Sequence, residues 1–150
     1  MTYEQLKLEN QLCFPFYAVS RLIIRAYQDD LDALGITYPQ YLVMMVMWEF
    51  EELSVIEIGE KLILNTNTVT PLLKRMETMD LITRIQSETD HRKVMIKLTD
   101  KGKNMKEAAA GIPLNLLQKL KLDPEKINAE EIKQLKSQLN QLIILLSNIE

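Results

Sequence analysis

The fold is decided by residues 54–98, which read SVIEIGEKLILNTNTVTPLLKRMETMDLITRIQSETDHRKVMIKL. The first half of this stretch has apolar residues at helical spacing on either side of a polar break at residues 64–68. One helix therefore begins near Ser54, and a second begins within residues 65–68, with Pro71 expected near its first turn. The two apolar faces consist of Val55, Ile58 and Leu62 in the first helix, and of Val69, Leu72, Leu73 and Met76 in the second.

The second half of the stretch changes to an alternating apolar pattern. Alternation predicts half-buried strands over residues 82–86 and 94–98, joined by a polar tip at 87–92. Two short helices with a tight turn, followed directly by a hairpin, form a winged helix-turn-helix. In that fold the second helix fits the major groove of duplex DNA.

Side chains suited to DNA lie on the outward face of the second helix and on the hairpin. Asn and Thr can bond to base edges or phosphates, Lys and Arg suit phosphates, and a narrow minor groove attracts Arg. The candidate DNA contacts are Asn67, Thr68, Thr70, Lys74 and Arg75 on the helix, with Arg84, Arg92 and Lys93 on the hairpin. The alternative is an ordinary solvated hairpin in which Asp90 merely pairs with Arg92.

Charge is unevenly distributed along the chain. The whole sequence carries a net charge of −3, but residues 61–103 carry +4 and the remainder −7. A basic middle within an acidic chain is typical of a localised phosphate-binding face, although chance clustering would give the same count. The distribution therefore supports double-stranded DNA as the partner.

Helices are expected on both sides of the DNA-binding stretch. Pro15 suits a first turn, so a helix is predicted over residues 14–33, and Thr37 is the expected N-cap of an apolar helix that follows. After the hairpin, a helix capped at Thr99 runs toward Ile112, where Pro113 interrupts it, and a last helix covers residues 124–149. The predicted class is mainly α with a small β-hairpin wing.

The last helix carries a seam of leucine and isoleucine at spacings of three and four, which is typical of helix-to-helix packing. The seam could pack against the N-terminal helix of the same chain, but its length favours a homodimer. Residues 1–35 and 112–150 are then dimerisation helices, and residues 36–111 form the DNA-binding region. Two recognition helices about 34 Å apart would match one duplex turn of a pseudo-palindromic operator. The seam consists of Ile132, Leu135, Leu139, Leu142 and Leu146.

The composition excludes several other classes of protein. One cysteine cannot form an internal disulfide framework, and one histidine far from it does not make a zinc site, so neither metal nor cofactor is expected. No apolar run approaches about 18 residues, and the first residues lack a signal-peptide pattern. A cytoplasmic protein without membrane association is the expectation.

Four short motifs together resemble the MarR family of transcriptional regulators over nearly the whole chain. They are Leu72-Leu73-Lys74-Arg75-Met76-Glu77, Leu81-Ile82-Thr83-Arg84, Asp90-His91-Arg92 and Leu98-Thr99-Asp100-x-Gly102. Within that family the chain is similar to the OhrR-type sensors of organic hydroperoxides. That similarity is carried by Leu8-Glu9-Asn10-Gln11-Leu12-Cys13-Phe14, by Tyr17 and Tyr27, and by Thr37-Tyr38-Pro39-Gln40-Tyr41.

The resemblance implies roles for particular residues. Cys13 would be the peroxide-sensing thiol, and Tyr27 and Tyr38 would donate hydrogen bonds to its sulfur from the other subunit of the dimer. Arg84, Asp90 and Arg92 would build the DNA-contacting wing. Proteins of this type repress a gene for a hydroperoxide-reducing enzyme and release the operator on oxidation. Because the chain has no second cysteine, it resembles the one-Cys type, whose sulfenic acid reacts with a small thiol.

The residues themselves are compatible with this chemistry. A helix N-terminus and phenolic donors both favour the thiolate form of Cys13, and the apolar neighbours Leu12, Phe14 and Phe16 suit an organic oxidant. Without the resemblance, a buried and inert cysteine would be the simpler interpretation. Two alternatives remain open: a regulator that answers to a small aromatic ligand with Cys13 passive, and, less favoured, a one-Cys thiol peroxidase.

Overall fold

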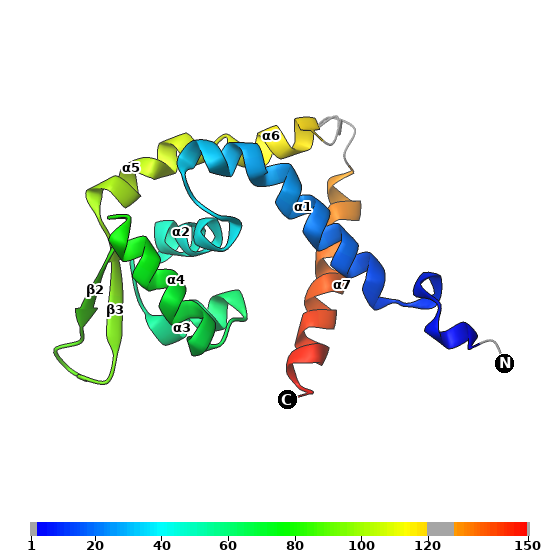
Figure 1. Ribbon diagram of the computed structural model, residues 1–150, viewed down its shortest axis with the longest axis horizontal. Helices are drawn as coiled ribbons and strands as arrows, with labels where there is room; N and C mark the ends of the chain where they lie inside the picture. Colours follow the sequence, from blue (N-terminus) through cyan, green and yellow to red (C-terminus); the bar gives the residue numbers. More distant parts are fainter. Residues whose placement is uncertain (1–2, 120–127, 150) are drawn as a thin grey trace. The chain divides into compact units, whose positions relative to one another are not determined.

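The computed structural model describes residues 3–119 and 128–149 and divides into two compact units, with the boundary between Ile112 and Pro113. The first unit is helical with a small antiparallel sheet, which confirms the predicted mainly α winged fold (Figure 1). Its elements are η1 (Glu4–Leu6), η2 (Leu8–Asn10), α1 (Cys13–Leu34), α2 (Tyr38–Phe50), β1 (Glu52–Ser54), α3 (Val55–Leu62), α4 (Thr66–Thr78), β2 (Ile82–Gln86), β3 (Val94–Leu98) and α5 (Asp100–Ala109). Two further helices follow, α6 (Ile112–Lys119) and α7 (Ala129–Ser147).

Helix starts in the first unit are fixed by side chains that satisfy free backbone N–H groups. Thr37 and Gln40 form a capping box at α2, and Ser54 and Glu57 form another at α3. Thr99 accepts from the backbone N–H of Gly102 at the start of α5, at 3.0 Å. These caps explain why the helix starts could be predicted from the sequence.

The sheet has three strands, in the order β1-β3-β2, where the sequence predicted a two-stranded hairpin. The hairpin strands have the predicted bounds, and Arg84 of β2 lies opposite Ile96 of β3. On the other edge of β3, Leu53 of β1 also lies opposite Ile96. The additional strand, β1, begins at Glu52, directly after the C-terminal end of α2. A strand of three residues is too short to show an alternating pattern.

The core of the first unit lies where α2, α3 and α4 meet the sheet. Its fully enclosed side chains come from each of these elements, so the two helices of the helix-turn-helix are held rigidly on α2 and the hairpin. The largest of them are Met44 and Met47 of α2, Ile58 of α3, Leu73 and Met76 of α4, and Ile82 and Ile96 of the strands.

The helix expected from Thr99 to Ile112 ends earlier than predicted. It stops at Ala109, and Pro113 then lies in the first turn of α6, where its missing N–H is tolerated. The last helix begins at Ala129, with Asn128 as its N-cap. The predicted start at 124 lies outside the described residues. No helix in the described ranges is long and apolar enough to cross a membrane.

Candidate nucleic-acid interface and thiol site

The start of α4 is organised around Asn65. Its side-chain oxygen accepts from both the backbone N–H and the hydroxyl of Thr68, each at 3.1 Å. Pro71 is the sixth residue of the helix, rather than a first-turn residue as expected, and it cannot donate to the carbonyl of Asn67. The N-terminal turn of α4 therefore presents free N–H groups, one free carbonyl and the exposed Asn67 side chain to solvent.

The predicted recognition face of α4 lies opposite its buried face. Val69, Leu73 and Met76 point into the core and are fully enclosed. The predicted contacts Asn67, Thr68, Lys74 and Arg75 are exposed, and Thr70 is half-buried. The helix thus combines amide, hydroxyl and cationic groups on the side that can enter a DNA groove.

The wing tip is closed by backbone hydrogen bonds and presents two cations. The N–H of Ser87 donates to the carbonyl of Lys93 at 2.9 Å, and that of Lys93 donates to Asp90 at 2.8 Å. The Asp90 carboxylate accepts from the backbone N–H and the Nε of Arg92, at 3.1 and 3.3 Å. Arg92 is still 93% exposed, so Asp90 orients the arginine without hiding it.

Arg84 lies apart from the other predicted DNA contacts. Its side chain is only 18% exposed, and its Nη1 lies 3.5 Å from the carboxylate of Glu77 on α4. The Nε of Arg84 is enclosed and makes no hydrogen bond to any described residue. Glu77 belongs to the Leu-Leu-Lys-Arg-Met-Glu motif, but nothing in the sequence pattern paired it with Arg84.

Cys13 is an exposed free thiol at the first residue of α1. The helix has no side-chain cap at this end, and the N–H of Phe14 donates to the carbonyl of Gln11 at 3.3 Å. The positive end of the helix dipole lies beside the thiol. Leu12, Phe14 and Phe16 are also exposed around it. The site therefore combines a reactive atom, a favourable dipole end and an apolar surface.

Three tyrosines form a ring cluster at the opposite end of α1. The centroids of Tyr27 and Tyr38 are 5.4 Å apart, and Tyr41 lies 6.0 and 6.4 Å from them. Burial raises the pKa of all three phenols, and the neighbouring tyrosines raise that of Tyr27 and Tyr41 further. These phenols stay protonated at neutral pH and can donate hydrogen bonds. Tyr41 was not predicted as a site residue.

The cysteine and the tyrosine cluster do not meet within one chain. Cys13 and Tyr27 both lie on α1, and fourteen residues of helix separate them by about 21 Å. The structure therefore brings Tyr27 and Tyr38 together but leaves both far from their expected partner, Cys13. A thiol site that contains all three residues needs a second copy of the chain.

Helices α1 and α7 each carry several apolar side chains that are exposed in the described part of the chain. Of the 22 residues of α1 only Leu31 is buried, and α7 has no buried residue. On α7 the seam residues Ile132, Leu135, Leu139 and Leu146 are exposed, and Leu142 is half-buried. On α1 the exposed apolar residues are Phe14, Phe16, Tyr17, Val19, Leu22 and Ile24.

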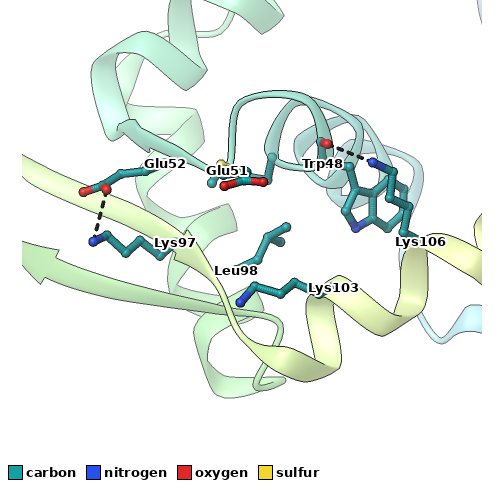
Figure 2. A pocket seen from close by; sticks show the side chains of 8 residues that line it. Trp48, Glu51, Glu52, Lys97, Leu98, Lys103 and Lys106 are labelled. Atoms are coloured by element: carbon teal, nitrogen blue, oxygen red, sulfur yellow. Dashed lines mark hydrogen bonds and ion pairs between the residues drawn. The ribbon is translucent and has the colours of Figure 1, made fainter.

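A groove opens on the first unit, and none of the predicted site residues lines it; Figure 2 shows its lining side chains. It has a volume of about 560 Å³ and an apolar floor that includes Met47, Trp48 and Leu98. All three of its lysines are engaged: Lys97 pairs with Glu52 at 3.0 Å, Lys103 pairs with Asp100 at 3.6 Å, and Lys106 donates to the carbonyl of Trp48 at 3.0 Å. The groove could accept a flat apolar molecule with one charged group.

Known proteins similar to the chain are transcriptional regulators. The family model for the transcriptional regulator SarA/Rot matches residues 25–109. The organic hydroperoxide resistance transcriptional regulator of Bacillus subtilis is 48% identical over 141 residues, which covers 94% of this chain and 92% of that protein.

Solved structures of AbfR from Staphylococcus epidermidis have the same fold. The reduced protein bound to DNA is 38% identical, covers both chains completely and has a TM-score of 0.81. The disulfide-formed protein is 36% identical, covers 97% of this chain and 95% of that one, and has a TM-score of 0.63. These matches confirm the family resemblance inferred from the motifs.

Proposed function

Because the chain belongs to the MarR family of winged-helix transcriptional regulators, we propose that it is a homodimeric repressor that senses organic hydroperoxides through Cys13. The observation that carries the proposal is the exposed thiol at the N-terminus of α1, flanked by apolar side chains. The similarity to a hydroperoxide resistance regulator over nearly the whole chain supports the same signal. Oxidation of Cys13 releases the operator.

The dimer is proposed to form through α1, α6 and α7, within residues 1–35 and 112–150. The exposed apolar faces of α1 and α7 support it, because contiguous apolar surface of this kind usually marks an interface. The separation of Cys13 from Tyr27 supports it independently. A twofold dimer lets each thiol meet the tyrosine pair of the partner copy, which one chain cannot do.

The DNA interface is proposed to comprise α4 in the major groove and the wing tip beside it, both within residues 36–111. Asn67, Thr68 and Thr70 contact base edges or phosphates, while Lys74, Arg75, Arg92 and Lys93 contact phosphates or the minor groove. Asp90 contributes by orienting Arg92. The DNA-bound structure of AbfR, which has a similar fold, supports this placement. The preferred operator is a pseudo-palindrome with half-sites about one duplex turn apart.

In the proposed sensing step, an organic hydroperoxide oxidises the thiol of Cys13 by two electrons. The Cys13 thiolate attacks the terminal peroxide oxygen, an S–O bond forms, the O–O bond breaks, and the alkoxide leaves and takes up a proton as an alcohol. The thiol is oxidised by two electrons to sulfenic acid, and the hydroperoxide is reduced. A small thiol then condenses with the sulfenic acid to give a mixed disulfide and water. The bulkier adduct at Cys13 changes the spacing of the two recognition helices.

A gel-shift titration tests the proposal, with duplex DNA from upstream of the protein's own gene. We expect binding by the reduced protein, loss of binding after cumene hydroperoxide and a small thiol, and recovery after reductant. Cys13→Ser protein should bind and ignore the oxidant. Release of the Cys13→Ser variant by oxidant would refute sensing through this thiol. Sustained consumption of hydroperoxide with excess thiol would indicate a peroxidase instead.

The groove beside Trp48 supports a second candidate signal, a small aromatic ligand. On this alternative Cys13 is passive, and an aromatic carboxylate packs on the apolar floor near Lys103. Trp48 is the only tryptophan, so its fluorescence reports occupancy of the groove directly. Release of DNA by benzoate without oxidant, together with quenching of Trp48, would favour the ligand; neither effect is expected for a hydroperoxide sensor.

A further inference from the structure

We propose that Arg84 does not contact DNA but positions the wing against the recognition helix through Glu77. The inference rests on the proposed DNA-binding function and assigns these two residues a role in it. Arg84 lies in the middle of β2, and Glu77 lies near the C-terminal end of α4. The pair therefore joins the two elements that must meet the duplex together.

The surroundings of Arg84 argue against a phosphate contact. Its side chain is 18% exposed, its Nη1 is directed at Glu77, and its Nε is enclosed without a partner among the described residues. A guanidinium that binds phosphate presents its N–H fork to solvent, as the 93% exposed Arg92 does at the wing tip. Moving Arg84 to a phosphate would break its contact with Glu77.

Residues 79–81 link α4 to β2, and the Arg84–Glu77 pair spans this link. The link is short, and Asp80 within it has a positive φ of 58°. The start of α5 already holds it, because Lys101 donates to the carbonyl of Met79 at 2.8 Å and Thr99 donates to that of Asp80 at 2.6 Å. The Arg84–Glu77 contact adds a side-chain bridge from β2 to α4 across the same link. The angle between the wing and the recognition helix is thus fixed by two separate sets of contacts.

A substitution of Glu77 distinguishes most sharply between a positioning role and simple repulsion of phosphate. It is an acidic residue on a DNA-binding helix and 43% exposed, so by charge alone it repels phosphate. If Glu77 has no positioning role, Glu77→Gln should tighten binding to DNA. If Glu77 anchors Arg84, the same substitution should weaken binding. The sign of the effect therefore separates the two roles.

The experiment measures affinity for the upstream duplex from about 50 to 200 mM salt for full-length reduced wild type, Arg84→Gln, Glu77→Gln and the double variant. Arg92→Gln is the matched control for a phosphate contact, and it should reduce the salt slope by about one. Arg84→Gln and Glu77→Gln should each weaken binding roughly tenfold at unchanged slope, with the double variant no worse than either. The exchanged pair Glu77→Arg with Arg84→Glu should recover most of the affinity.

A salt slope reduced by about one in Arg84→Gln would overturn the proposal, and so would tighter binding in Glu77→Gln. Failure of the exchanged pair to bind, in a variant whose circular dichroism and unfolding midpoint match wild type, would also contradict it. If wild type itself binds no duplex, the proposed DNA-binding function fails instead. A failure of the positioning role and a failure of the DNA-binding function therefore give different results.

Discussion

The phenol rings of Tyr27 and Tyr38 lie with their centroids 5.4 Å apart, although one residue is on α1 and the other begins α2. Burial raises the pKa of both hydroxyls, so each remains a protonated donor at neutral pH. A pair of donors fixed in this way is suited to stabilise an anionic sulfur that approaches from a second copy of the chain. We therefore propose that Tyr27 and Tyr38 take part in the sensing chemistry as well as in the packing of α1 on α2.

Replacing Tyr38 by Phe tests that role, because the ring stays and only the donor is lost. A hydrogen bond to a charged group is worth about 1.5–3 kcal/mol, so the rate of Cys13 oxidation by cumene hydroperoxide should fall at least roughly tenfold. Loss of the free thiol, followed by mass spectrometry, provides the rate. Tyr3→Phe, at an exposed tyrosine outside the cluster, is the matched control and should react like wild type. Equal rates for both variants would contradict the role of Tyr38.

The seam on α7 predicts how the dimer can be broken. Leu135→Glu with Leu139→Glu places two charges on the apolar face, which a paired helix would have to bury at high cost. Sedimentation should then show monomers, and operator affinity should fall by roughly a hundredfold as the second half-site contact is lost. Ser137→Glu places a charge on the opposite face of the same helix and should leave the dimer intact. A double variant that stays dimeric would exclude the seam as the interface.

The capping box at α3 predicts an acid dependence of stability. The side-chain hydrogen bond from Ser54, followed by its backbone N–H, lowers the pKa of Glu57 from its usual 4.5. A lowered carboxyl pKa in the folded state stabilises the protein above pH 4.5, and that stabilisation is lost as the pH falls through the folded-state pKa. Ser54→Ala should cost about 1 kcal/mol at neutral pH and less at pH 3, measured by urea unfolding at each pH. An equal loss of unfolding free energy at both pH values would contradict a stabilising effect of the lowered Glu57 pKa. The control variant is Ser137→Ala.

Gly102 predicts a steric requirement at the joint between α5 and the sheet. A Cβ there would collide with the backbone carbonyl of Leu81, a group that cannot rotate away. Gly102→Ala should destabilise the protein by about 1–3 kcal/mol, measured as the guanidinium unfolding midpoint. Gly111→Ala adds the same methyl group where nothing lies within 4 Å, so it should be neutral or slightly stabilising. Equal midpoints for the two variants would contradict the predicted clash.

The sequence was sufficient for the elements whose signals are local. Periodicity located α3, α4 and both hairpin strands, and the capping residues Thr37, Ser54 and Thr99 placed the helix starts within a residue or two. The third strand, β1, was missed because three residues are too few to show an alternating pattern, and its pairing with β3 is a long-range contact. The break before α6 was assigned to Pro113, whereas it falls at residues 110–111, and Pro113 lies in the first turn of α6.

Among the site residues, too, some are identified by local sequence signals and others depend on long-range packing. Cys13 and the cations of the wing could be named as candidates from residue type and motif, and the structure shows that they are exposed. The environment of Arg84 could not, since its contact with Glu77 depends on how β2 crosses the end of α4. Tyr41 is a similar case: only the packing of α1 on α2 brings it to Tyr27 and Tyr38.

One time course tests most directly whether modification of Cys13 releases DNA. Fluorescence anisotropy of a labelled operator duplex would be recorded after cumene hydroperoxide is added to the reduced complex with a small thiol present, while samples are quenched for intact-mass spectrometry. We expect release to rise in step with the Cys13–thiol mixed disulfide, and we expect the Cys13→Ser complex to stay bound. Complete release while Cys13 is still unmodified would contradict it.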